Sequence, residues 1–328
     1  MYERNVGLLE KKINEHGFIR NISKHLKEDG SFDYEGNLSQ WDEACRDFEK
    51  IYLWTHGEEK MTEGAGASYM IFIPAENKNA DTILVAHGGG FGIRTGCEGG
   101  NVAWEFHKRG YNTVILVYRM LPVANRYQTT ADMQQAIRIL REKTTELEIG
   151  KNIILMGFSA GAMTAGACAT HYNDVITESG EVISSGVLLG KGADSRPDLA
   201  VISYGAMSTV SFPMPFMAEV DTSLFGESDK DKFYFATEKH VTHETCPMFI
   251  WQTLSDDGRH GMTLAKALQD AGVSYELHIM DGGVHGLALA DGENDLESNV
   301  PHINHWVELC DEWIQMQLGG KSVFKHVI

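Results

Sequence analysis

Short apolar runs alternate with longer amphipathic stretches from about residue 66 onward. The runs are rich in β-branched residues, and most are apolar at successive positions, which is typical of strands buried on both faces. We expect strands at residues 68–74, 82–88, 112–119, 152–158, 198–205, 247–253 and 274–280. Strands that alternate with helical stretches predict an α/β fold with a mostly parallel central sheet flanked by helices.

The stretches between these runs carry apolar residues at helical spacing. In residues 129–147, Ile137 and Leu140 belong to one apolar face of a helix, and Thr130 or Asp132 is available as its N-cap. Further helices are expected at residues 98–109, 160–171, 261–271 and 302–317.

Two segments fall outside this alternation. Residues 1–64 are polar with scattered aromatic residues, and we expect an N-terminal extension there, a cap or a dimer contact, beside a main domain at residues 65–328. The aromatic residues are Phe32, Tyr34, Trp41, Phe48, Tyr52 and Trp54. Residues 206–243 have no clear period. Because long ordered insertions between strands often border the ligand crevice of an open sheet, residues 206–243 are predicted to form a cap-like insertion or pocket wall.

Composition and charge exclude several classes of protein for this sequence. The 328 residues, 43% of them hydrophobic, suffice for one large domain with an appendage. A formal charge of -18 opposes binding to nucleic acid or anionic lipid, both of which require clustered Lys and Arg. Five cysteines without a C-x-x-C pair indicate reduced thiols. With neither a signal-peptide core nor an 18-residue apolar window, we expect a cytoplasmic protein with no membrane partner.

A G-x-S-x-G motif, Gly157 to Gly161, follows the strand expected at 152–158 and precedes a helical stretch of small residues. This strand, sharp turn and helix are the context of a nucleophile elbow, with Ser159 as the nucleophile. Glycine is required on both sides of the serine because the turn leaves no room for side chains. The helix that begins here directs its first N–H groups at a developing oxyanion, and the N–H of Ala160 is the expected donor.

A second glycine-rich segment, HGGGF at residues 87–91, also follows an apolar run. Consecutive glycines let backbone N–H groups face a cavity, so we select Gly89 and Gly90 as further oxyanion donors. Composition alone would give roughly 0.2 matches to G-x-S-x-G and roughly 0.02 matches to H-G-G-G per chain. The two motifs together, each after a strand, are therefore a strong indication of nucleophilic catalysis.

A nucleophilic serine needs a base and an acid. Of the 14 histidines, His285 stands out because it lies in the glycine-flanked loop after the last expected strand. Asp256 and Asp257 follow the strand at 247–253 and complete the chain order Ser, Asp, His. An aspartate at this place is also suited to cap the helix expected from residue 261.

This arrangement resembles the α/β-hydrolase fold esterases of the acyl-carbohydrate type, near the acetyl-xylan and feruloyl esterase-like and hormone-sensitive-lipase-like groups. The resemblance covers roughly residues 66–318 and rests on HGGGF, GYNTVILVYRMLP, NIILMGFSAGA, RPDLAVISYG and SYELHIMDGGVHGLALA in this order. It implies an α/β-hydrolase fold and a triad of Ser159, His285 and an aspartate. The T-x-x-D spacing of these esterases falls on residues 253–256, which favours Asp256 and leaves Asp257 open.

The sequence also departs from these esterases. SDDGRHGMTL lacks the usual Val-Pro after the acid and is about three residues short, and GFSAGA ends in Ala where a third Gly is common. Residues 1–64 match no part of the pattern. These departures bear on the identity of the acid and on the pocket rather than on the fold.

The resemblance implies a serine carboxylesterase that cleaves short acyl esters, such as O-acetyl groups on a carbohydrate, through an acyl-enzyme intermediate. Phe91, Phe212, Phe216 and Met217 are candidate pocket residues that suit an apolar acyl group. Two alternatives stay open: a serine peptidase or amidase of the same fold, and a non-catalytic ligand-binding protein on the hydrolase scaffold.

We expect a small-molecule or oligosaccharide acyl ester as the partner, and a homo-oligomer remains open. No cofactor is expected. His302 and His305 have a spacing that suits metal ligation, but no third ligand lies near them in the sequence, so no metal is expected either.

Overall fold

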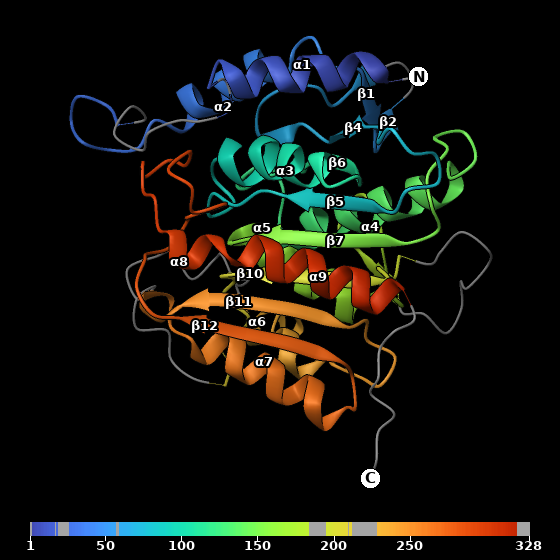
Figure 1. The fold of residues 1–328 in the computed structure, drawn as a ribbon, viewed down its shortest axis with the longest axis vertical. Helices are drawn as coiled ribbons and strands as arrows, with labels where there is room; N and C mark the ends of the chain where they lie inside the picture. The colour runs from blue at the N-terminus through green and yellow to red at the C-terminus, as the bar shows by residue number, and fades with distance from the viewer. Residues whose placement is uncertain are drawn as a thin grey trace.

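The computed structural model describes residues 2–16, 18, 26–56, 59–183, 195–208, 210–211 and 228–319. Its described residues form an eight-stranded sheet in the order β1-β4-β6-β5-β7-β10-β11-β12. β4 is antiparallel to both β1 and β6, and the remaining neighbours are parallel. The sheet is therefore mostly parallel, as the sequence predicts, and Figure 1 shows it from the β1 edge to the β12 edge.

All seven strands expected from the apolar runs are present, and each differs from its expected range by at most two residues at either end. They are β4 (Tyr69–Ile73), β5 (Thr82–Ala86), β6 (Asn112–Val117), β7 (Ile153–Phe158), β10 (Leu199–Ser203), β11 (Met248–Thr253) and β12 (Tyr275–Met280). The additional strands are β1 (Lys50–Tyr52) and two short antiparallel pairs, β2 (Thr55–His56) with β3 (Glu59–Lys60) and β8 (Val175–Ile176) with β9 (Val182–Ile183).

Helices cover both faces of the sheet. Successive residues of a strand point to opposite faces, so in β5 Leu84 enters one apolar core and Ile83 and Val85 enter the other. The Leu84 core packs under α4 (Arg126–Glu142), α5 (Ala160–Thr170) and α7 (Arg259–Asp270). The other core packs under α1 (Glu3–Asn14), α3 (Val102–Lys108) and α9 (Trp306–Leu318), of which α3 and α9 lie toward the viewer in Figure 1.

The expected N-cap of α4 is wrong. The helix begins at Arg126, and Asn125 caps it, because the Asn125 side chain accepts from the Gln128 N–H while the Gln128 side chain accepts from the Asn125 N–H. Thr130 and Asp132 both lie in the second turn and are buried. Asp132 forms a buried ion pair instead of capping the helix.

Two other expected helices are interrupted. The stretch at 98–109 divides into a π-helical turn, η3 (Cys97–Asn101), and α3. The stretch at 302–317 divides at His305 into α8 (Pro301–Asn304) and α9. The remaining short helices are α2 (Tyr34–Cys45), η2 (Gly64–Gly66), α6 (Asp229–Tyr234), η5 (Thr237–Lys239) and η6 (Leu254–Asp256).

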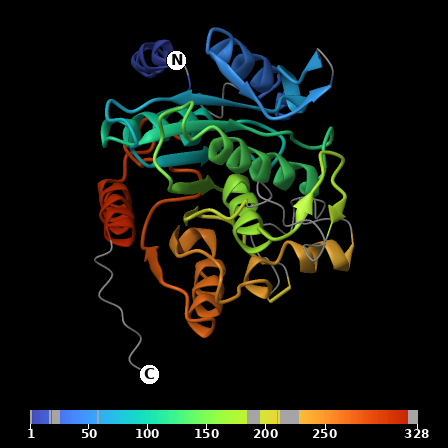
Figure 2. The same ribbon diagram turned by 90° about the vertical axis from the view of Figure 1, so that its right-hand side faces the viewer.

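The segment before residue 65 is joined to the sheet rather than set apart from it. Its strand β1 pairs with β4, and both views place α1 and α2 at this edge (Figure 1, Figure 2). The Asn5 side chain of α1 donates to the carbonyls of Glu49 and Phe72 at 3.0 Å each and accepts from the Glu49 N–H at 2.9 Å. The first helix is thereby fixed to the strands beneath it.

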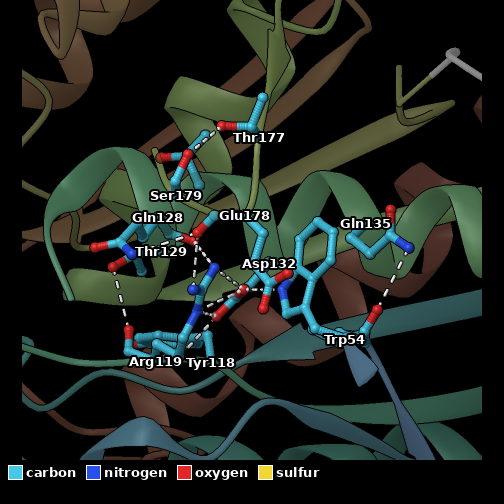
Figure 3. Close-up of polar contacts among 12 residues, drawn as sticks. Trp54, Tyr118, Arg119, Gln128, Thr129, Asp132, Gln135, Thr177, Glu178 and Ser179 are labelled. Carbon is cyan, nitrogen blue, oxygen red and sulfur yellow. Dashed lines mark hydrogen bonds and ion pairs between the residues drawn. The ribbon is translucent and has the colours of Figure 1, made fainter. Parts of the chain in front are cut away.

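A buried ion pair connects this segment to the body of the fold (Figure 3). Arg119, after β6, lies 2.6 Å from Asp132 of α4, and the two side chains are 4% and 0% exposed. Asp132 also accepts from the Trp54 indole N–H at 2.6 Å, and Arg119 donates to the Glu178 carbonyl between β8 and β9 at 2.9 Å. Four separate parts of the chain meet at this pair.

Residues 209 and 212–227 of the insertion expected at 206–243 lie outside the described residues, and Phe212, Phe216 and Met217 are among them. Its described part includes α6 and η5. All five cysteines are described, and each is buried and free of a disulfide, in agreement with the expectation of reduced thiols. Within the ranges given above, no helix has the length and apolar character needed to cross a membrane.

Candidate active site

Ser159 occupies the sharp turn between β7 and α5. Its φ of 50° and ψ of -117° are strained for a residue with a side chain, as expected for a nucleophile elbow. A Cβ on Gly157 would lie 2.4 Å from the Gly161 carbonyl oxygen, and a Cβ on Gly161 would lie 2.2 Å from the Ala86 carbonyl oxygen. The steric requirement for both glycines is therefore confirmed.

The structure brings Ser159, His285 and Asp256 together at the carboxyl edge of the sheet. Ser159 Oγ lies 2.8 Å from His285 Nε2, and His285 Nδ1 lies 2.7 Å from Asp256 Oδ1. The Asp256 carboxylate accepts a hydrogen bond from His285 Nδ1, so Nδ1 carries the proton of the neutral ring. Nε2 is therefore free of a proton and accepts from the Ser159 hydroxyl. This is the hydrogen-bond order that a serine nucleophile requires.

The loops that carry the acid and the base are tied to each other. Ser255 Oγ donates to the Gly283 carbonyl at 3.1 Å and lies 2.8 Å from Thr253 Oγ1. The ring of Tyr204, at the end of β10, packs edge-on against His285 with centroids 5.1 Å apart. These contacts fix the plane and position of the imidazole.

The pKa of His285 is raised above its ordinary value of 6.5. Burial alone would lower this pKa, but the hydrogen bond and the negative charge of Asp256 outweigh it, and the charge of Glu98 adds to them. The side chain is 43% exposed, whereas Asp256 is only 2% exposed. The imidazolium is thus favoured by a buried carboxylate while the ring can still be reached from the pocket.

Asp257, the alternative acid, points elsewhere. Its carboxylate is hydrogen-bonded by the guanidinium and the backbone N–H of Arg259, and its φ of 55° turns the chain away from Asp256. The hydrogen bonds from Arg259 lower the pKa of Asp257. Helix α7 begins two residues later with Gly258 as its N-cap, and the Asp257 side chain satisfies the N–H of its first residue, Arg259.

The expected oxyanion donors border the same cavity. Gly89, Gly90 and Ala160 line the pocket around Ser159, and their N–H groups have no hydrogen-bond acceptor within the described part of the chain. The N–H of Gly88 is already used, since it donates to Glu98 at 2.9 Å and to Thr95 at 3.1 Å. Free amide donors are therefore present beside the serine on two sides.

The pocket itself has a volume of about 320 Å³. Its apolar wall includes Phe91, the one candidate pocket residue of the sequence analysis that lies among the described residues. Ala206, in the pocket wall expected at 206–243, also lines the pocket. Sequence analysis did not select several other lining residues, namely Ile93, Glu98, Met163, Tyr204, His260, Asp295 and Leu296. Tyr204 could have been found from its place after a strand, and Glu98 as the single charge in a run of small residues.

His302 and His305 are not part of this pocket. Across the described residues, no group of three or more His, Cys, Asp or Glu side chains could hold a metal ion. The arrangement around Ser159 consists of protein groups suited to nucleophilic acyl chemistry.

Comparison with known proteins decides the family. Residues 70–258, more than half of the chain, match BD-FAE. The chain belongs to the BD-FAE family. This BD-FAE protein has the α/β-hydrolase fold, as a solved structure of the acetyl ester-xyloside bifunctional hydrolase from Caldicellulosiruptor lactoaceticus illustrates. That structure is 26% identical, with a TM-score of 0.68, and the match covers 83% of this chain and 96% of that one.

Two curated relatives of this BD-FAE protein are longer. Endo-1,4-beta-xylanase B of Butyrivibrio fibrisolvens is 29% identical over 252 residues, which are 74% of this chain and 38% of that protein. Acetylxylan esterase of Xylanibacter ruminicola is 23% identical over 264 residues, which are 76% of this chain and 49% of that protein. The chain thus spans less than half the length of either relative.

Proposed function

We propose that this BD-FAE protein is a serine carboxylesterase that removes short acyl groups, such as acetyl, from a carbohydrate. One observation carries the proposal: Ser159, His285 and Asp256 form a continuous hydrogen-bonded series beside free backbone N–H groups. The names of the related acetylxylan esterase and acetyl ester-xyloside hydrolase support the ester and the sugar as substrate class.

The chemistry follows from the hydrogen bonds. His285 Nε2 takes the proton as Ser159 Oγ attacks the acyl carbon, and the N–H groups of Gly89, Gly90 and Ala160 stabilise the oxyanion. The resulting imidazolium gives its proton to the departing sugar oxygen as the bond between that oxygen and the acyl carbon breaks, which leaves the acyl group on Ser159. Water then attacks the acyl carbon as His285 takes its proton, and His285 returns that proton to Ser159 Oγ as the carboxylic acid is released. Asp256 holds the imidazole in place and offsets its positive charge in both halves.

The pocket supports a small acyl group. Its volume of about 320 Å³ is at the lower end of ligand pockets, which span roughly 300–1,000 Å³. We therefore expect kcat/KM to be higher for p-nitrophenyl acetate than for p-nitrophenyl decanoate. A preference for decanoate would contradict the short-chain assignment while leaving the esterase chemistry intact.

Replacement of the nucleophile tests the proposal. Ser159→Ala should lower turnover of p-nitrophenyl acetate by a factor on the order of 10⁴ to 10⁶, because no other group supplies the attacking oxygen. Ser31→Ala is a suitable control, since that exposed hydroxyl donates to Asp29 and does not line the pocket. Unchanged turnover in Ser159→Ala would refute the proposed mechanism.

A direct comparison of substrates is needed to identify which bond the protein cleaves. We expect acetate release from acetylated xylo-oligosaccharides and no cleavage of a panel of peptide p-nitroanilides. Peptide cleavage that depends on Ser159, with no ester cleavage, would instead identify a peptidase or amidase of the same fold.

A further inference from the structure

We propose that Glu98 and Tyr204 form a positioning bridge that holds the oxyanion loop (residues 88–91) and the histidine loop (residues 281–290) in register around Ser159. This inference rests on the proposed function and assigns two further residues to the same site. Neither residue belongs to the triad or supplies an oxyanion N–H.

Glu98 is the first half of the bridge. It is 2% exposed and lies in the π-helical turn η3, where both its oxygens are engaged. One oxygen accepts from the N–H of Gly88 at 2.9 Å and from the hydroxyl of Thr95, and the other accepts from the hydroxyl of Tyr204 at 2.7 Å. All three neighbours are donors, so the carboxyl group acts as an acceptor at every contact.

Tyr204 is the second half. It is 2% exposed, and its hydroxyl accepts from the N–H of Ala288 in the histidine loop at 3.0 Å while it donates to Glu98. Burial, and then the charge of Glu98, raise the pKa of Tyr204 well above 10.0, so the phenol keeps the proton that it donates. The same ring packs edge-on against His285. One side chain therefore contacts Glu98, the histidine and the loop that carries it.

Gly88 links the bridge to the nucleophile. A Cβ on Gly88 would lie 2.4 Å from a Glu98 oxygen and 2.8 Å from the Cβ of Ser159. The Gly88 backbone is thus packed between these two side chains. Because Glu98 holds the N–H of Gly88, it sets the position of the next peptides, which carry the proposed oxyanion donors Gly89 and Gly90.

The bridge also brings a second negative charge toward the base. The titratable and charged side chains that line the pocket around His285 are Asp256, Glu98, Tyr204, Asp295 and His260. Asp256 has the largest effect in favour of the imidazolium, and the charge of Glu98 acts in the same direction. Loss of the Glu98 charge should therefore lower the pKa of His285, whereas loss of the Tyr204 hydroxyl leaves the charge in place.

A matched pair elsewhere in the chain provides the control. Tyr111 donates to Asp311 at 2.7 Å, the same distance as from Tyr204 to Glu98, and this pair joins the residue before β6 to α9 on the side of α3. Neither Tyr111 nor Asp311 lines the pocket. Tyr111→Phe and Asp311→Asn remove the same chemical groups with no expected effect on kcat.

The experiment compares Glu98→Gln, Tyr204→Phe, their double variant and the two controls on p-nitrophenyl acetate. We expect kcat to fall about 10- to 100-fold in each single variant with KM changed less than about threefold, because the donors and the base are misplaced rather than removed. The double variant should lose less than the product of the two single losses. In Glu98→Gln alone, the acid limb of kcat/KM should move to lower pH.

Titration of the His285 imidazole by NMR separates this proposal from the proposed function, since it needs no substrate. The pKa of His285 should fall in Glu98→Gln and stay unchanged in Asp311→Asn. An unchanged pKa, or a kcat in Tyr204→Phe equal to that of the wild type, would overturn the bridge. Tyr204→Phe keeps the ring and decides the point even if Glu98→Gln does not fold. A wild type that cleaves no ester would instead overturn the proposed function.

Discussion

Backbone strain at single residues marks the pocket. Ser159, Phe91 and Tyr204 have φ values of 50°, 62° and 41°, in a region that residues with a Cβ rarely adopt. Such a conformation costs about 1–3 kcal/mol and persists only where surrounding contacts hold it. All three residues line the pocket, and Phe91 and Tyr204 are fully buried. The tertiary contacts of the site therefore maintain a geometry that the local sequence alone opposes.

The two adjacent aspartates give the sharpest test of a single residue. Asp256→Asn should lower kcat on p-nitrophenyl acetate by about 10⁴, because an amide at this place favours the wrong tautomer of His285. The kcat of Asp257→Asn should stay within about threefold of the wild type, since Asp257 pairs with Arg259 and not with His285. Equal losses in the two variants would contradict the assignment of the acid.

The raised pKa of His285 predicts the pH dependence of the reaction. The neutral imidazole is the base, so kcat/KM falls as the pH decreases through the pKa of His285 in the free enzyme. Because that pKa lies above the ordinary 6.5, the pH at which kcat/KM has fallen to half of its plateau value should also lie above 6.5. A rate profile for p-nitrophenyl acetate from pH 5 to 9 measures this midpoint, and a midpoint below 6.5 would contradict it.

Sequence analysis selected the serine because it lies directly after a buried strand, and the histidine because it lies in the glycine-flanked loop after the last strand. It favoured Asp256 through the T-x-x-D spacing of the resemblance but left Asp257 open, because the left-handed turn that sends the Asp257 carboxylate away is visible only in the structure. Glu98 and Tyr204 each have a local signal, a single charge among small residues and a place directly after a strand, but neither signal indicates a partner. Their contact joins residues 106 positions apart and depends on the tertiary fold.

At the scale of elements, the strands with two apolar faces were the most predictable. β1 was missed because its three residues, KIY, have too little pattern, and its place at the edge is set by pairing with β4. The N-cap of α4 was misplaced although the sequence carries the required signal. Asn125 and Gln128 stand three residues apart at the true start, the spacing of a capping box.

Helix α2 contacts the segment that follows the oxyanion loop, and this contact has a testable consequence. Asn37 of α2 accepts from the Arg94 N–H at 2.9 Å and donates to the Arg94 carbonyl at 3.3 Å, just beyond the oxyanion loop. Asn37→Ala should lower kcat on p-nitrophenyl acetate about 3- to 30-fold, because the segment after Gly90 loses its anchor. It should also reduce the free energy of unfolding by about 1–3 kcal/mol.

Asn5→Ala is the matched control for this contact. Asn5 is equally buried and also bonds only to backbone groups of Glu49 and Phe72, but these lie at the β1 edge, away from the pocket. It should lose similar stability in urea unfolding and keep kcat. If both variants keep kcat, α2 has no positioning role at the oxyanion loop.

At the scale of the whole molecule, the ion pair of Arg119 and Asp132 is the point where distant parts of the chain converge (Figure 3). It joins the end of β6 and α4 to Trp54 of the N-terminal segment and to the turn between β8 and β9. A buried pair costs desolvation when it forms, but removal of one partner leaves an uncompensated buried charge. Its effect on stability should therefore depend strongly on whether one or both partners are changed.

We predict that Arg119→Met and Asp132→Leu each reduce the free energy of unfolding by about 3–5 kcal/mol, because each leaves the other charge buried without its partner. The double variant should lose clearly less than the sum, since no unpaired charge remains, although the Trp54 indole and the Glu178 carbonyl still lose a partner. Urea unfolding followed by circular dichroism measures all three. Lys266→Ala, which breaks an exposed pair with Asp270, should change stability by less than about 1 kcal/mol. Additive losses from the two buried partners would mean that their charges stabilise the fold independently, and the ion pair would then not couple the N-terminal segment to the rest of the molecule.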